Sequence, residues 1–327
     1  MHVNTNDVGP ANMAHSKLSV IGAGAVGSSI AYASLIRGSA RQIALYDIDQ
    51  TRVEAEVRDL AHGTQFTPTE WVMGGSDMSV LKDSSVIVIT AGARQKPGQS
   101  RMDLAAQNAS IMAKLVPQML EQAPDAVLVM VTNPCDVLTV VAQQVSGLPV
   151  GRVLSTGTLL DTSRLRWAIA RRAGVSLSNV HAAMMGEHGD TEFALWSSAT
   201  IAQIPIRDWT NPDGERVFSE QSLAQIAYDT VHAAYSIIEG KGATNYAIGL
   251  AAARLVEAIL GDQHKIWPLS SVLTDYLGVS NVALSVPTMV GPNGVQRVFD
   301  FPMDAHEISL LHRSAAAIRS SLDSLGY

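Results

Sequence analysis

Cysteine is almost absent from this chain, and long apolar or basic runs are absent altogether. Cys135 is the single cysteine among 327 residues, so the chain cannot form an internal disulfide, and it fits a reducing compartment such as the cytosol. No uninterrupted apolar run approaches the roughly 20 residues that a bilayer span requires. Lysine and arginine form no run and the formal net charge is -7, so we expect neither nucleic acid nor a membrane as a partner.

Apolar residues are plentiful. They make up 47% of the chain against 16% charged residues, which excludes disorder by composition, and the length suits two domains. Residues 1–16 are polar and lack the basic start and apolar core of a signal peptide, so we expect a flexible tail there. His2 and His15 stand isolated in this tail, and we expect no metal site.

Short apolar runs alternate with helical patterns from Lys17 onward, which is typical of an α/β domain with a parallel sheet. Val86–Ile89 and Val127–Val131 are apolar throughout, as expected of strands covered by helices on both faces. The sequence therefore predicts a Rossmann-type, doubly wound sheet over residues 17–156. The expected strands are Leu18–Ile21, Gln42–Tyr46, Val86–Thr90 and Ala126–Thr132, and the expected helices are Ser28–Ile36, Arg52–Ala61 and Met102–Glu121.

The rhythm changes after about Thr156, where we expect a second, α+β domain over residues 157–327 that carries catalysis and subunit contacts. Its pattern predicts helices and one strand in place of a regular alternation. The expected helices are Asp161–Arg172, Glu220–Glu239, Asn245–Leu260 and Asp304–Leu325, and the expected strand is Val279–Val286.

Gly22-Ala-Gly-Ala-Val-Gly27 has the form G-x-G-x-x-G between a predicted strand and a predicted helix. The first glycine permits a tight turn, the second lets the backbone approach a pyrophosphate, and the third lets the helix pack on the strand. Asp47 ends the second strand, where a carboxylate binds ribose hydroxyls and repels a 2′-phosphate, which favours NAD over NADP. Arg52 leaves NADP open, and a glycine turn without ligand is the remaining alternative.

Polar residues of the second half form two groups. Gly186-Glu-His-Gly-Asp190 predicts an exposed loop of defined shape, and the extended chain before it would place His181 and His188 on opposite faces. Asp161 and Arg164 are three residues apart and share a helix face, whereas Arg166 points elsewhere. Each of these residues taken alone could equally be structural, because buried Asp–His pairs and surface arginines are common. Their joint pattern therefore carries the interpretation.

Six motifs together resemble the L-lactate dehydrogenase branch of the lactate/malate dehydrogenase family, from about Lys17 to the C-terminus. The motifs occur in the family's order. They are Gly22-Ala-Gly-Ala-Val-Gly27, Thr90-Ala-Gly-Ala-Arg-Gln-Lys-Pro-Gly98, Val131-Thr-Asn-Pro134, Gly157-Thr-Leu-Leu-Asp161, Gly186-Glu-His-Gly-Asp190 and Lys241-Gly-Ala-Thr244.

The resemblance implies a hydride transfer between NAD and a small 2-hydroxy acid. His188 would donate the proton to the substrate carbonyl, and Asp161 would orient its ring. Arg101 would stabilise the developing charge after closure of the Pro- and Gly-containing loop before it, and Arg164 would bind the substrate carboxylate. Asn133 and Thr244 would complete the substrate site. The cofactor-binding residues implied are Gly22, Gly24, Val26, Gly27, Asp47, Arg52, Thr90, Ala91, Gly92, Asn133, Thr156 and Ile248.

Gln95 bears on the choice of substrate, because similar malate dehydrogenases have an arginine at the corresponding position that pairs with the second carboxylate of oxaloacetate. A neutral residue here favours pyruvate and lactate. Arg94 keeps malate dehydrogenase open as the alternative, and a non-catalytic descendant of the same fold is a third hypothesis.

Arg166 and His181 match the residues that bind a phosphate of fructose bisphosphate in the similar, bisphosphate-activated bacterial enzymes. The resemblance thus implies an anion site between subunits of a homotetramer, where fructose bisphosphate would act as an activator. The alternative is that Arg166 is a solvated helix residue and His181 a structural one.

Overall fold

The computed structural model describes residues 16–93 and 101–327, without the side chain of Arg101. Most of the predicted tail therefore lies outside the described residues, as does Gln95. Ser16, the last residue of that tail, is buried and accepts a hydrogen bond from the Gln42 backbone N–H, so the fold begins there. Within the described residues, no helix is both long and apolar enough to cross a membrane.

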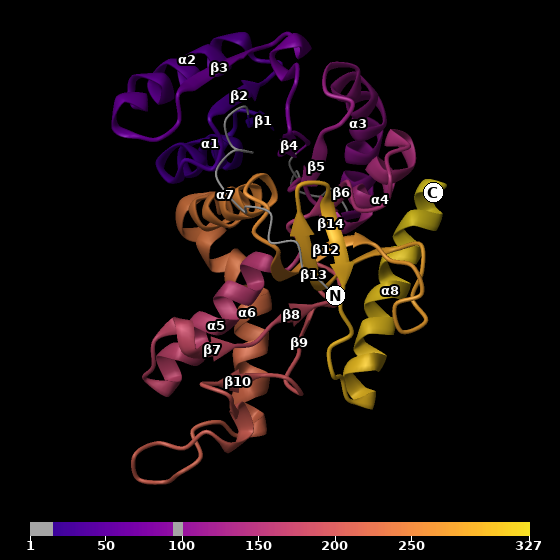
Figure 1. The fold of residues 1–327 in the computed structure, drawn as a ribbon. Coiled ribbons are helices and arrows are strands. Elements are labelled where there is room, and N and C mark those ends of the chain that lie inside the picture. The colour runs from indigo at the N-terminus through magenta and orange to yellow at the C-terminus, as the bar shows by residue number, and fades with distance from the viewer. Residues whose placement is uncertain (1–15, 94–100) are drawn as a thin grey trace, which may run out of the picture.

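A nine-stranded sheet forms the centre of the molecule, in the order β14-β13-β12-β6-β5-β4-β1-β2-β3 (Figure 1). Strands β1 to β6 are all parallel, and their order, 3-2-1-4-5-6, is that of the Rossmann fold, so the predicted fold class is confirmed. The strand bounds are β1 Lys17–Ile21, β2 Gln42–Tyr46, β3 Trp71–Gly75, β4 Val86–Ile89, β5 Val127–Met130 and β6 Val153–Ser155.

The strands β3 and β6 were not predicted. β3 is the edge strand and carries an exposed Trp71 and two glycines, which is a weak strand pattern. β6 has only three residues, although all three are buried. Three helices of this half match the expected ones within a few residues, namely α1 Ala25–Arg37, α2 Gln50–His62 and α3 Arg101–Gln122. The fourth, α4 Cys135–Ser146, was not predicted.

The C-terminal half continues the same sheet. Strand β12 pairs antiparallel with β6, and β13 and β14 follow it in antiparallel order. Because the sheet is continuous, the domain division into 17–156 and 157–327 stays a prediction. The elements of this half are α5 Leu159–Ala173, α6 Glu220–Lys241, α7 Tyr246–Leu260, β12 Lys265–Val272, β13 Ala283–Gly291, β14 Gly294–Val298 and α8 Ala305–Leu325.

One strand predicted for this half is wrong in part. The strand expected at Val279–Val286 begins only at Ala283, because Tyr276 and Val279 form a turn and Asn281 has a left-handed φ of 59°.

Two small sheets lie outside the main sheet. One contains β7 Val180–His181, β10 Thr200–Ile201 and β11 Ile204–Pro205, and the other contains β8 Met184–Met185 and β9 Phe193–Ala194. Short 3-10 turns occur at Thr64–Phe66, Met78–Leu81, Leu177–Asn179 and Ile206–Asp208.

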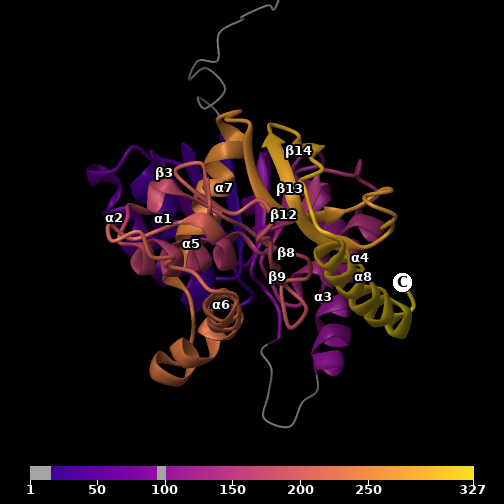
Figure 2. The same ribbon diagram turned by 90° about the horizontal axis from the view of Figure 1, so that it is seen from below.

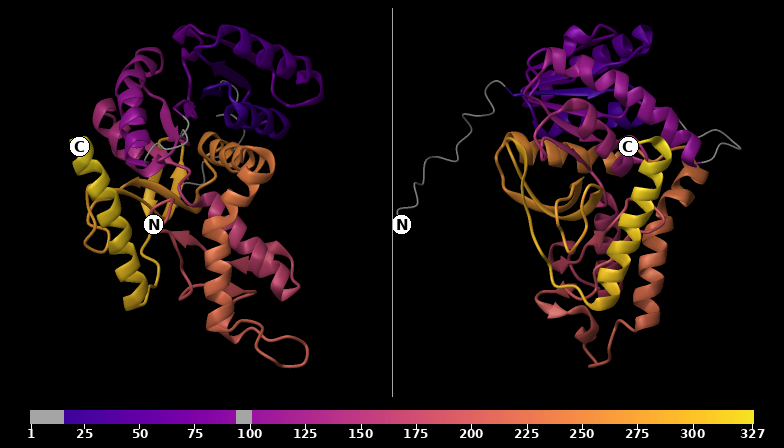
Figure 3. Two further views of the ribbon diagram at one scale, coloured as in Figure 1. Left: turned by 180° about the vertical axis from the view of Figure 1, so that it is seen from behind. Right: turned by 90° about the vertical axis from the view of Figure 1, so that its right-hand side faces the viewer.

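Helices cover both faces of the sheet, as Figures 2 and 3 show. One face is packed by α3, α4 and α8, whose apolar residues form one buried cluster with the strands. On the other face, α1 and α7 pack with the strands into a second cluster. A helix of the C-terminal half therefore lies directly against the helix that follows the glycine turn.

The contact between α1 and α7 is unusually close. A Cβ added to Gly249 of α7 would lie 2.8 Å from the Ser29 carbonyl oxygen of α1. Beside it, Asn245 Nδ2 donates to Ser29 Oγ at 2.8 Å, and Arg37 forms an ion pair with Glu257 at 2.9 Å. Glycine at position 249 thus sets the distance between the two helices.

We predict that Gly249→Ala destabilises the protein by about 1–3 kcal/mol, because the added methyl group must push α1 away from α7. Gly240→Ala in α6 is the matched control, since an added Cβ there meets nothing within 4 Å, and alanine favours a helix by about 1 kcal/mol. Denaturant unfolding of both variants measures the difference. Equal stability of the two variants would contradict the packing argument.

Candidate active site

The glycine turn joins β1 to α1 at the carboxyl edge of the parallel strands. Gly22 has a φ of +102°, and a Cβ on Gly27 would lie 1.8 Å from the Gly22 carbonyl oxygen, so both positions require glycine. Thr90 Oγ1 donates to the Ile21 carbonyl at 2.9 Å and ties the turn to the end of β4. Helix α1 starts at Gly24 without a side-chain cap and without an acidic residue in its first turn. Its first N–H groups thus lack a side-chain partner, which suits an anionic group.

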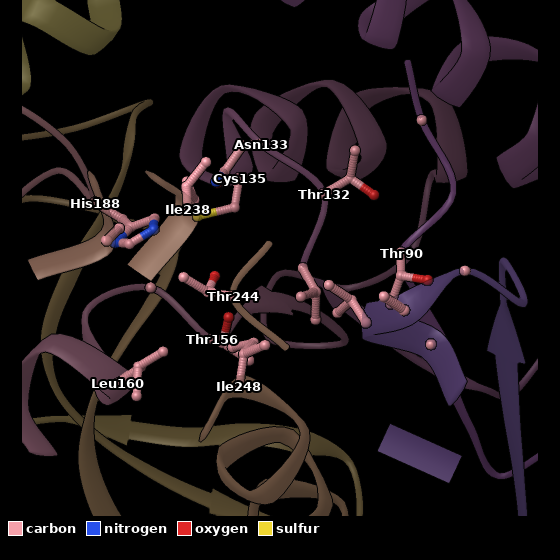
Figure 4. Close-up of a pocket in the computed structure, with 18 of the residues that line it drawn as sticks. Thr90, Thr132, Asn133, Cys135, Thr156, Leu160, His188, Ile238, Thr244 and Ile248 are labelled. Carbon is pink, nitrogen blue, oxygen red and sulfur yellow. The ribbon is translucent and has the colours of Figure 1, made fainter. Parts of the chain in front are cut away.

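A pocket of about 330 Å³ opens beside this turn (Figure 4). His188 lies at one end and Thr90 at the other, with Thr244, Thr156 and Ile248 between them. The pocket brings together most of the predicted cofactor and substrate residues from both halves of the chain. Those that line it are Gly24, Val26, Gly27, Thr90, Gly92, Asn133, Thr156, Arg164, His188, Thr244 and Ile248.

Four predicted cofactor residues do not line the pocket. Gly22 belongs to the turn, and Ala91 follows strand β4 and packs against the core. Asp47 Oδ2 accepts a hydrogen bond from Ala23 N at 2.7 Å, which fixes the carboxylate at the rim of the turn. Arg52 is exposed on α2, 3.9 Å from Asp49.

A second cavity, of about 310 Å³, lies on the other side of His188. It shares Asn133, Arg164 and His188 with the first pocket and adds Asp161 and Glu192. His188 therefore lines both the pocket at the glycine turn and a second cavity with room for a small molecule.

His188 and Arg164 are joined by the carboxylate of Asp161. His188 Nδ1 lies 2.7 Å from Asp161 Oδ2, and Arg164 Nη1 donates to Asp161 Oδ1 at 2.7 Å. Asp161 and Arg164 thus share a helix face, as their spacing predicts. Burial disfavours the charged ring, but the charge and hydrogen bond of Asp161 outweigh it and raise the pKa of His188 well above its ordinary value. Burial likewise opposes ionisation of Asp161, yet His188 and Arg164 keep its pKa below the ordinary value.

The prediction that one extended segment separates His181 from His188 is wrong in its premise. Strands β7 and β8 belong to different sheets, and Gly186, which pairs with Ser285, has a left-handed φ of 89°. His181 is nevertheless exposed and outside both cavities.

Three side chains of the site were missed by sequence reasoning. Asp136 is 1% exposed, and its Oδ2 accepts a hydrogen bond from the His188 backbone N–H at 2.7 Å; burial raises its pKa to about 6. Asn108 is fully buried and bridges Ala93 N and the Asn133 carbonyl. Glu192 lies 3.8 Å from His188 Nδ1. The available hint was the same for Asp136 and Asn108, namely a polar residue within an apolar helix pattern.

Arg166 and His181 lie away from the cavities. Arg166 Nε donates to the carbonyl of Ala182 at 2.8 Å, so the arginine reaches the residue next to His181. Burial lowers the pKa of Arg166. Arg101 begins α3, but its side chain, like Gln95, lies outside the described residues.

The Rossmann order, the uncapped helix at the glycine turn and the paired histidine in the same crevice define a dinucleotide-dependent oxidoreductase. Comparison with known proteins identifies the family. Residues 16–155 match the NAD-binding domain of the lactate/malate dehydrogenases and residues 158–325 their alpha/beta C-terminal domain. The chain belongs to the lactate/malate dehydrogenase family.

Relatives and solved structures agree with this assignment over the whole length. An L-lactate dehydrogenase of Bifidobacterium animalis subsp. lactis is 47% identical over 312 residues, which cover 95% of this chain and 98% of that protein. One of Kosmotoga olearia is 42% identical, covering 94% and 96%. A lactate dehydrogenase structure from a Medee basin deep-sea metagenome library has a TM-score of 0.91 at 37% identity, covering 96% and 99%. The structure of the minor L-lactate dehydrogenase of Enterococcus mundtii has a TM-score of 0.90 at 36% sequence identity, and the match covers 94% of this chain and 98% of that one.

We predict that Asp161→Asn lowers stability in a pH-dependent way. Because the pKa of His188 is raised in the fold, its charged ring contributes its full stabilisation at pH values below the unfolded pKa of about 6.5. This stabilisation is lost as pH rises through the folded pKa. The lowered pKa of Asp161 stabilises above about 4 and is lost as pH falls further.

The difference in unfolding free energy between wild type and Asp161→Asn should therefore be largest between about pH 4 and 6.5 and shrink in alkali. Denaturant unfolding across pH measures it, with Asp213→Asn in an exposed turn as the control for loss of one charge. A difference that stays constant from acid to alkali would count against the pairing.

Proposed function

We propose that this chain is an NAD-dependent L-lactate dehydrogenase that interconverts pyruvate and (S)-lactate. The observation that carries the proposal is the His188–Asp161–Arg164 arrangement between the pocket at the glycine turn and the second cavity. It combines a proton donor with a guanidinium for a carboxylate, which a 2-keto acid requires. The names of the relatives support lactate over malate.

The residues at the turn suit a dinucleotide. The uncapped N-terminus of α1 would hold the pyrophosphate, and Asp47 at the rim would bind the adenosine ribose and favour NAD. Gly92, Thr156 and Ile248 would enclose the nicotinamide, with Asn133 at its ribose. When bound, NADH supplies the hydride that reduces the substrate carbonyl carbon.

The protein's own contribution is to bind the acid, orient it and move a proton. Arg164 binds the substrate carboxylate, while Asn133 and Thr244 line its position. His188 has Nδ1 against Asp161, so Nε2 donates the proton to the carbonyl oxygen, and its raised pKa keeps the ring charged for that step. Arg101, whose side chain lies outside the described residues, would add a positive charge for the same oxygen, as the resemblance implies.

NADH consumption with pyruvate and with oxaloacetate, each with and without fructose bisphosphate, tests the proposal. Faster turnover of pyruvate is expected. Faster turnover of oxaloacetate would establish the alternative, a malate dehydrogenase, and no turnover of either would favour the non-catalytic hypothesis.

We predict that Gln95→Arg shifts kcat/KM towards oxaloacetate over pyruvate by about tenfold or more, because the new guanidinium pairs with the second carboxylate. Gln118→Arg, an exposed change on α3, adds the same charge elsewhere and should leave the ratio unchanged. Steady-state kinetics with both acids measure the ratio. An unchanged ratio in Gln95→Arg would refute the role given to Gln95.

We also propose that fructose bisphosphate activates a homotetramer through Arg166 and His181. In support, Arg166 is partly buried and donates to the Ala182 carbonyl, but it has no carboxylate partner among the residues described. A partly buried cation without a carboxylate partner favours an anion. Large apolar side chains exposed on three helices support subunit contacts, namely Tyr32, Ile36, Ile238, Tyr246 and Leu250. The single, buried cysteine supports a cytosolic location.

We predict that Arg166→Gln and His181→Gln abolish the effect of fructose bisphosphate on half-saturation by pyruvate, with little change at saturating pyruvate. Arg171→Gln on the same helix removes an exposed arginine and should retain activation. Pyruvate saturation curves with and without the bisphosphate provide the measurement. Full activation of both variants would exclude the site.

A further inference from the structure

Glu192 is a buried carboxyl group in the site that the mechanism above does not use. It precedes β9 and is 7% exposed. Its Oε2 lies 3.8 Å from His188 Nδ1, on the same ring nitrogen that faces Asp161. One ligand-type atom from each of Asp161, His188 and Glu192 lies within 4.8 Å of the others. Two carboxyl groups therefore lie near the same ring nitrogen of His188.

The two carboxyl groups differ in their partners. Asp161 is bonded to both His188 and Arg164, whereas Glu192 Oε2 has no hydrogen-bond partner in the described part of the chain. A buried oxygen without a partner is costly, so it needs compensation by charge or proton binding. The cations that act on Glu192 are His188 and Arg164, and the anion that acts on it is Asp161.

We propose that Glu192 is a positioning residue for the proton donor, a second carboxyl group whose charge decides how firmly His188 holds its proton. The inference rests on the proposed function, because it concerns the same histidine. It assigns to Glu192 an effect on the pH range of the reaction, whereas Asp161 fixes the orientation of the ring.

The electrostatics of the cluster give the direction of the effect. Burial raises the pKa of Glu192 to about 7, assisted by the charge of Asp161 and opposed by His188 and Arg164. Glu187, Asp136 and Cys135 also act on the cluster, but the pKa of Cys135 is raised to about 12 and its thiol stays neutral. Near neutral pH, Glu192 therefore gains a negative charge that opposes loss of the His188 proton.

The consequence differs for the two directions of reaction. Pyruvate reduction needs charged His188, so an ionised Glu192 extends it to higher pH. Lactate oxidation needs the neutral ring, so the same charge moves its onset to higher pH.

The test is Glu192→Gln, which keeps the shape and removes the charge. In the full chain labelled with ¹⁵N-histidine, the pKa of His188 should fall by about one unit or more. The alkaline limb of kcat/KM for pyruvate should move to lower pH by the same amount. Glu192→Asp should restore at least half of the shift. Asp213→Asn, which removes one charge from an exposed turn, should change neither.

An unchanged His188 pKa in Glu192→Gln would overturn the proposal, and so would a rate lowered equally at every pH, which indicates packing alone. The wild type offers a test without a variant, since His188 should respond to two ionisations, and a single-step titration would also overturn it. The NMR titration needs no substrate. A chain that fails to reduce pyruvate would contradict the proposed function and leave this test intact.

Discussion

The carboxylate of Asp161 holds the candidate active site together. It is 1% exposed, and its two oxygens are shared between the His188 ring and the Arg164 guanidinium. A buried charge is tolerated only when it is paired, so the carboxylate requires both cations as much as it orients them. The His188 ring and the Arg164 guanidinium are therefore placed by one group on the first turn of α5.

The site also depends on how the two halves of the chain are joined. Strand β12 extends the parallel sheet by pairing with β6, and α7 packs against α1 at Gly249 and Ser29. Thr244 lies just before α7 and Ile248 in its first turn, so this contact brings them beside the glycine turn. The pocket that His188 lines is consequently formed where the two halves of the chain meet.

Local sequence patterns were sufficient to predict the buried parallel strands and the glycine turn. Buried parallel strands such as Val86–Ile89 are continuous apolar runs, and the glycine turn has fixed spacing, so both could be found without coordinates. The edge strand β3 and the three-residue β6 were missed, because an exposed or very short strand has little pattern. The extended segment predicted before His188 was wrong, because residues after β7 pair with a different sheet.

The sequence by itself determined the alternation of buried strands and helices, the glycine turn, and the shared helix face of Asp161 and Arg164, since each follows from neighbours within a few residues. Only the tertiary structure brought Asp136, Asn108 and Glu192 to the site. Their partners are far away in sequence or, for Glu192, across a bend of the chain that no periodicity describes. The pKa of a buried carboxyl group depends on these neighbours in space, so the charge balance around His188 became visible only in the fold.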